Sequence, residues 1–214
     1  EGKWHDLQIS PYEDLRLNPS AKVLHYGQEI FEGMKVLPRP SANPCVFRLF
    51  DHHKRFNLSA QRLMMPTIPE KIYRDATNLL VEFVKDFIPQ ASGTFLYLRP
   101  FMFGTEAQLG VKPSTDYKFV IIASPCQPLV GADGVNLYIE REYTRAAPGG
   151  IGSAKTGGNY AASLVSLQRA YTRGCQQVLW LDAFTKNWVE ECSGSNFFAV
   201  IDGKLCTPPF LILF

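Results

Sequence analysis

One lysine in a glycine-rich segment is the residue of this sequence best placed for covalent chemistry. Lys155 lies in the segment 149–158, and it is the only charged residue between Arg145 and Arg169. A desolvated lysine has a lowered pKa, and its free amine can form a Schiff base with an aldehyde. Phosphate binding is a second possibility, but Ala154 stands where a phosphate-binding loop requires glycine before its lysine. A solvated loop lysine is the third.

The cysteines and histidines indicate no metal site. The five cysteines are odd in number and include no CxxC pair, which argues against both a disulfide framework and a zinc knuckle. His52 and His53 are adjacent, so on a helix they cannot both face one site, and no other ligand spacing occurs. We therefore expect isolated thiols in a reducing cytoplasm and no bound metal.

The charge balance excludes two classes of partner. Lys and Arg number 22, Asp and Glu number 20, and the net charge is +2. This balance is typical of neither nucleic-acid nor anionic-membrane binding. No apolar run approaches the ~20 residues of a membrane helix, and no signal peptide is apparent. We expect small-molecule partners, with no nucleic acid and no membrane.

The elements that must position these residues are short strands and amphipathic helices. In the first half, strands are expected at 23–26, 46–49, 94–102 and 117–123. A helix should begin at an Asp51 N-cap and reach about Met65, where Pro66 ends it. A second helix is expected over 70–87, with one apolar stripe made of Ile72, Ala76, Leu79, Leu80, Phe83, Val84 and Phe87.

The second half follows a segment rich in proline and glycine at 124–133, which predicts an interdomain linker. A strand is expected over 135–143, and a helix from an Asn159 N-cap to about Arg173, ended by Gly174. Its apolar face would hold Tyr160, Leu164, Leu167 and Tyr171. Strands follow at 177–182 and 188–191, and Asp202-Gly203 predicts a hairpin turn. The chain is thus α+β, with a small domain at 1–123 and a larger one at 134–214.

Four motifs in order carry a family resemblance. The chain resembles the branched-chain amino-acid aminotransferases of fold type IV, which use pyridoxal 5'-phosphate (PLP), in the segments 24–35, 96–100, 153–163 and 174–182. The resemblance runs from about Trp4 to Pro209. It implies a two-domain fold of the D-amino-acid-aminotransferase type and reversible transamination of Leu, Ile or Val with 2-oxoglutarate through a PLP Schiff base.

The resemblance also implies a role for each matching residue. Lys155 matches the lysine that holds PLP and moves a proton as general base and acid. Glu191 matches the glutamate that pairs with the pyridine nitrogen, whereas Glu190 should point to the opposite face as a solvated edge charge. Arg55 matches the phosphate-binding arginine. Tyr160 matches the tyrosine near the phenolic oxygen of the cofactor.

The substrate pocket follows by the same correspondence. Tyr26, Phe31, Tyr97 and Arg99 match pocket positions, and an aromatic-lined slot suits a branched aliphatic side chain. Plain core packing is an equal alternative for Phe31. Part of this pocket belongs to the neighbouring subunit in the family, which implies a homodimer.

The sequence departs from the family after Pro209. The family continues well beyond this point, and 210–214 resembles none of it. We therefore expect a C-terminally truncated second domain, a complete protein that is an active transaminase, and a weakly active or inactive chain here. Within the fold, a D-amino-acid transaminase or an aminodeoxychorismate lyase is the alternative. Outside it, the alternative is a truncated product that only dimerises or binds PLP.

Overall fold

The computed structural model describes residues 3–39, 43–127 and 134–209. The chain divides into two compact units, Glu1–Pro128 and Leu129–Phe214. Strand β5 (Tyr117–Cys126) continues three residues into the segment expected to be a linker. Residues 128–133 of that segment lie outside the described residues.

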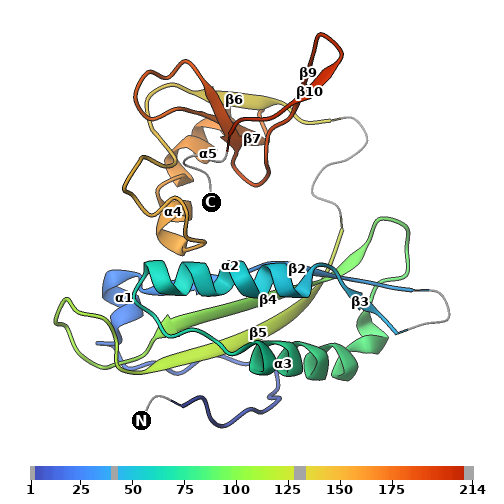
Figure 1. Ribbon diagram of the computed structural model, residues 1–214, viewed down its shortest axis with the longest axis vertical. Coiled ribbons are helices and arrows are strands. Elements are labelled where there is room, and N and C mark those ends of the chain that lie inside the picture. Colours follow the sequence, from blue (N-terminus) through green and yellow to red (C-terminus); the bar gives the residue numbers. More distant parts are fainter. Residues whose placement is uncertain (1–2, 40–42, 128–133, 210–214) are drawn as a thin grey trace. The chain divides into compact units, whose positions relative to one another are not determined.

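The first unit is built on one antiparallel sheet (Figure 1). Its centre is the ten-residue strand β4 (Phe95–Gly104), which pairs along one edge with β5. Two short strands, β1 (Glu29–Phe31) and β2 (Met34–Leu37), follow each other along the other edge of β4, and β3 (Cys45–Val46) pairs with β2. The turn 32–33 between β1 and β2 therefore lies beside the middle of β4.

The two faces of β4 have different surroundings because strand side chains alternate. Leu96, Leu98 and Met102 are fully or almost fully buried in the core of the unit. Helices α2 (Leu49–Arg62) and α3 (Glu70–Phe83) contribute to the same core, which also contains Phe56, Ala60, Tyr73 and Val81. Tyr97, Arg99 and Phe101 alternate with these residues and face the other way, and all three are only half-buried.

The strand expected at 46–49 is only the two-residue β3, because Leu49 already begins α2. Three other expectations for this unit were wrong. The strand expected at 23–26 is the short helix α1 (Lys22–Tyr26), which ends at Gly27 with φ 59°. Four apolar or aromatic residues are too few for their spacing to separate a strand from one helical turn. The helix expected from Asp51 begins earlier, after Arg48 in a left-handed conformation, so Asp51 lies in its first turn.

The third is the helix expected over 70–87, which ends at Phe83 and is followed by the 3₁₀ turn η1 (Lys85–Phe87). Its apolar stripe was only partly right, because Ile72, Leu80 and Val84 pack against the core but the fully buried positions lie one residue further on. Tyr73, Thr77 and Val81 are buried, whereas Leu79, Phe83 and Phe87 are 45%, 68% and 71% exposed. The threonine is accommodated in the core because its hydroxyl donates a 2.7 Å hydrogen bond to the Tyr73 carbonyl.

The second unit contains a three-stranded sheet in the order β6-β7-β8. Strands β6 (Leu137–Glu140) and β7 (Gln177–Leu181) are parallel, and β8 (Val189–Cys192) is antiparallel to β7. Parallel neighbours require a long crossover, which here carries helices α4 (Gly157–Ala161) and α5 (Leu164–Thr172). One buried hydrophobic cluster of this unit contains Ala170, Val178 and Trp180.

Beyond this sheet, β9 (Ala199–Ile201) and β10 (Lys204–Cys206) form a separate hairpin. Asp202 and Gly203 have φ values of 50° and 74°, so the predicted turn is confirmed.

The single helix expected from Asn159 to Arg173 is two helices. Thr156 is the N-cap of α4, and Asn159 lies inside that helix, where its amide donates to the carbonyls of Ile151 and Ala154. The break falls at 162–163, and Gly174, with φ 72°, ends α5 as expected.

The expected apolar face is not the buried one. Within the described part of the chain, the buried residues of this region are Asn159, Ser163, Ser166 and Ala170. Of the expected face only Leu167 packs against the core, whereas Tyr160, Leu164 and Tyr171 are exposed. No helix among the described residues is both long and apolar enough to span a bilayer.

Candidate active site

Lys155 lies in the crossover between β6 and β7, immediately before α4. Its Nζ donates a 2.7 Å hydrogen bond to the Tyr160 hydroxyl and lies 5.1 Å from the centroid of that ring. The buried Asn159 fixes the preceding loop through bonds of 3.0 and 2.8 Å to the carbonyls of Ile151 and Ala154. Lys155 is half-buried. It is therefore a positioned amine and not a freely solvated loop lysine.

Glu191 on β8 belongs to the same unit and forms an ion pair with Arg145 through Nε and Oε1. The two side chains are only 16% and 15% exposed. Burial raises the pKa of Glu191, whereas the positive charges of Arg145 and Lys155 act in the opposite direction. The net effect is a raised pKa, and Lys155 is close enough to be one of the cations that limit the rise.

Glu190 corrects the expectation of a solvated edge charge. It points away from Glu191, as the alternation of β8 requires, but its face is buried and the residue is 7% exposed. Both carboxyl oxygens are buried without a hydrogen-bond partner among the described residues. Burial raises the pKa of Glu190. The sequence could not reveal this, since alternation gives the direction of a side chain and not what covers that face.

Arg55 on α2 is anchored by a residue that sequence reasoning missed. Its Nη2 donates to Oε2 of Glu32 at 2.7 Å, and its Nε donates to Oε1 of the same carboxylate. His52, one turn earlier on α2, contacts Oε2 at 2.9 Å. Glu32 has no exposed side-chain area. The signal available in the sequence was an acidic residue between apolar ones, in the run Ile30-Phe31-Glu32-Gly33-Met34.

Phe31, Tyr97 and Arg99 form one cluster in the first unit. The guanidinium carbon of Arg99 lies 4.6 Å from the centroid of Phe31 and 5.3 Å from that of Tyr97. Arg99 also donates to the Tyr97 hydroxyl at 3.0 Å, and its buried Nε has no hydrogen-bond partner within the described chain. Gly33 lies against this cluster, because a Cβ there would be 1.9 Å from the Tyr97 hydroxyl oxygen.

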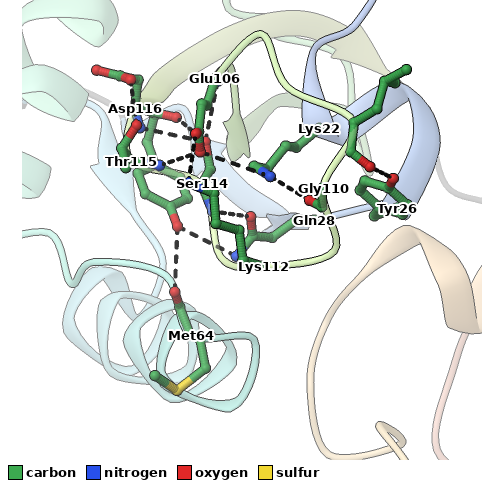
Figure 2. A network of polar contacts seen from close by, with 12 residues as sticks. Lys22, Tyr26, Gln28, Met64, Glu106, Gly110, Lys112, Ser114, Thr115 and Asp116 are labelled. Carbon is green, nitrogen blue, oxygen red and sulfur yellow. Dashed lines mark hydrogen bonds and ion pairs between the residues drawn. The ribbon is translucent and has the colours of Figure 1, made fainter.

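Tyr26 lies in a different cluster from the other three pocket candidates. Its hydroxyl donates to the carbonyl of Leu109, which lies in the loop between β4 and β5. Hydrogen bonds of this kind hold that loop against the α1 region (Figure 2). In the same network, the fully buried Lys22 donates to the Gly110 carbonyl at 2.6 Å, and the Ser114 amide donates to Gln28 at 3.0 Å. Tyr26 itself is 42% exposed.

The described residues therefore present two groups of functional side chains, one in each unit. The second unit combines an amine, a phenol and a paired carboxylate in Lys155, Tyr160 and Glu191. The first combines an anchored guanidinium with an arginine–aromatic cluster. Among residues 3–39, 43–127 and 134–209, no group of three or more His, Cys, Asp or Glu side chains could hold a metal ion. The chemistry available is that of an amine next to proton-transfer groups.

Comparison with known proteins identifies close relatives. Residues 29–212 match the family described as amino-transferase class IV. The branched-chain-amino-acid transaminase 1 of Bacillus subtilis is 46% identical over 208 residues, which are 96% of this chain and 58% of that protein. The chain thus spans less than two thirds of the length of this curated relative.

Solved structures give the same result. The Escherichia coli branched-chain amino acid aminotransferase is 29% identical, with a TM-score of 0.78 over 95% of this chain and 66% of that one. The branched-chain aminotransferase of the thermophilic archaeon Thermoproteus uzoniensis, solved with norvaline, is 27% identical, with a TM-score of 0.77 over 93% and 65%. The resemblance and the fold type expected from the sequence are both confirmed.

Proposed function

The chain belongs to the class IV aminotransferases, and on this premise we propose that it carries the PLP-binding machinery of a branched-chain amino-acid aminotransferase. The reaction would transfer an amino group reversibly between Leu, Ile or Val and 2-oxoglutarate. The observation that carries the proposal is the half-buried Lys155 amine, hydrogen-bonded to Tyr160, beside the paired carboxylate of Glu191.

These residues fit the chemistry of PLP. Lys155 would bind the aldehyde carbon, Tyr160 would lie at the phenolic oxygen, Glu191 at the ring nitrogen and Arg55 at the phosphate. When bound, PLP supplies an electron-poor ring that stabilises negative charge developing at the substrate Cα. The donor set supports this assignment, because an amine, a phenol and a carboxylate paired with Arg145 lie in one unit.

The protein's own groups would supply proton transfer and orientation. The Lys155 amine would take a proton from the substrate Cα and return one, as general base and then general acid. Tyr160 orients that amine through the 2.7 Å hydrogen bond. Glu191 would hold a proton at the ring nitrogen, and the Arg145 ion pair opposes the rise that burial causes in the pKa of this carboxyl.

The first unit would supply the substrate pocket. Phe31 and Tyr97 offer aromatic surface for a branched aliphatic side chain, which is recognised by apolar contacts alone. Arg99, which lies against both rings, would instead pair with the distal carboxylate of 2-oxoglutarate. We also propose that the protein forms a homodimer. Tyr26 would line the same pocket there, next to the neighbouring subunit. The five free cysteines support a reducing compartment, the cytoplasm.

The test is chemical trapping of the lysine. The chain is incubated with PLP, reduced with borohydride and digested, and the modified peptide is identified by mass spectrometry. We expect the pyridoxyl mass on Lys155, no such adduct in Lys155→Ala, and an unchanged adduct in the control Lys204→Ala on the β10 strand. Addition of L-leucine before reduction should reduce the trapped fraction. Labelling spread over surface lysines, or labelling that persists in Lys155→Ala, would refute the assignment.

A further inference from the structure

A buried carboxylate outside the expected site organises one of its arginines. Glu32 lies in the turn between β1 and β2 and has no exposed side-chain area. Its two oxygens accept from Nε and Nη2 of Arg55, and Oε2 also lies 2.9 Å from Nδ1 of His52. Arg55 and His52 are three residues apart and thus on the same face of α2.

The partners of Glu32 explain why this buried carboxyl is ionised. Burial alone would raise the pKa of Glu32, but the hydrogen bonds and charges of Arg55 and His52 outweigh it and lower the pKa. The carboxylate is therefore ionised at neutral pH. A fully buried anion persists only when it is paired, so Glu32 and Arg55 constrain each other.

The turn that carries Glu32 is itself fixed. The Glu32 amide donates to the Pro100 carbonyl at 2.7 Å, and the Gly33 amide donates to Oε2 of Glu32 at 3.1 Å. Gly33 packs so closely against Tyr97 that a Cβ would overlap its hydroxyl. The carboxylate is thus attached to the central strand of the sheet and not to a mobile loop.

We propose that Glu32 is a positioning residue that fixes the orientation of the Arg55 guanidinium for the phosphate of the cofactor. A guanidinium is a planar fork with five N–H donors, so one edge can bind a carboxylate while another faces a phosphate. A bidentate carboxylate fixes both the plane and the rotation of that fork. This inference rests on the proposed role of Arg55.

A purely structural role for Glu32 would have a different signature. If Glu32 only stabilised the unit, its loss would weaken the binding of every ligand alike. If it orients Arg55, its loss weakens only ligands that carry a phosphate. The discriminating quantity is therefore the ratio of the dissociation constant of pyridoxal to that of PLP, which isolates the contribution of the phosphate.

The experiment measures both dissociation constants by absorbance titration for the unchanged chain and three variants. We expect Glu32→Gln to lower the ratio about tenfold, as is typical when a charge-assisted contact is lost, while pyridoxal affinity stays within about twofold. The control Glu106→Gln removes a partly buried, paired carboxylate of the same unit and should leave the ratio unchanged. Arg55→Gln should lower the ratio at least as far as Glu32→Gln.

The outcomes separate the two proposals. If Arg55→Gln leaves the ratio unchanged, or the unchanged chain shows no preference for PLP, the proposed role of Arg55 fails. If Arg55→Gln lowers the ratio and Glu32→Gln does not, only the positioning role fails. Should Glu32→Gln not fold, Glu32→Asp keeps the charge but withdraws the carboxylate by one methylene. That variant should also lower the ratio, and an unchanged ratio would overturn the inference.

Discussion

Replacing Arg145 with glutamine removes the cation that compensates the Glu191 carboxylate. Both side chains are largely buried, at 15% and 16% exposure, so solvent offers little replacement for the lost partner. Removing one member of a buried ion pair costs about 3–5 kcal/mol, because the remaining charge is left uncompensated. Since some exposure remains, we expect Arg145→Gln to lower the free energy of unfolding by about 3 kcal/mol at neutral pH.

The loss of stability in Arg145→Gln should depend on pH, in a direction set by the pKa of Glu191. Burial raises the pKa of Glu191 above its ordinary value, and Arg145 opposes that effect, so the variant must have a pKa higher still. A carboxyl whose pKa is raised on folding contributes stability that is present below its unfolded-state pKa and is lost as the pH rises through the folded-state pKa. The loss in Arg145→Gln should therefore be small below the ordinary carboxyl pKa of 4.5 and should grow as the pH rises above it.

The assay is urea unfolding at several pH values, followed by the fluorescence of Trp180, which is 1% exposed in the core of the second unit. The exposed Arg141 offers a control, and Arg141→Gln should change stability by less than about 0.5 kcal/mol. Adding Glu191→Gln to Arg145→Gln should restore most of the loss, since no unpaired charge remains. A loss independent of pH, or no recovery in the double variant, would refute the reasoning.

Four further changes have defined outcomes. Gly33→Ala should displace Tyr97 and weaken leucine binding several-fold with the fold retained, as measured by absorbance titration of the PLP-loaded chain and by circular dichroism. Glu190→Met should raise the free energy of unfolding by about 1–3 kcal/mol, because two buried unpartnered oxygens are removed, and a urea titration that shows a loss would count against this. Asp182 has a pKa lowered by backbone hydrogen bonds, so the chain should lose its contribution as the pH falls, and Asp182→Asn should flatten the acid limb of the stability curve. Phe56→Ala should cost about 3–5 kcal/mol in chemical unfolding, because its fully buried ring leaves a cavity.

The sequence predicted the elements best where turn chemistry is local. Asp202-Gly203 and Gly174 take the positive φ values that their residue types favour. It failed where the distinction depends on tertiary contacts. The residues 23–26 form a helical turn that packs beside the β4–β5 loop through the buried Lys22, and no short-range pattern contains that contact.

The site residues divide in the same way. The contact of Lys155 with Tyr160 is local, because the two residues are only five apart along the chain and must lie close together in any fold. The partners of Arg55 and Glu191 could not be anticipated, since Glu32 is 23 residues from Arg55 and Arg145 is far from Glu191 along the chain. Charge compensation of buried groups is a property of the folded arrangement, and the sequence alone does not reveal which opposite charges will meet.

The crossover between β6 and β7 has a consequence for the order of folding. Residues 141–176 lie between two strands that pair in parallel, and this segment carries Arg145, Lys155 and Tyr160. Closing so long a loop costs chain entropy before any strand contact repays it, so such pairing is intrinsically slow. The carboxylate of Glu191 lies on β8, which pairs with β7. We therefore expect the amine and its carboxylate neighbour to come together once this crossover has closed, so that a refolding chain gains its affinity for an aldehyde cofactor late, in step with the burial of Trp180.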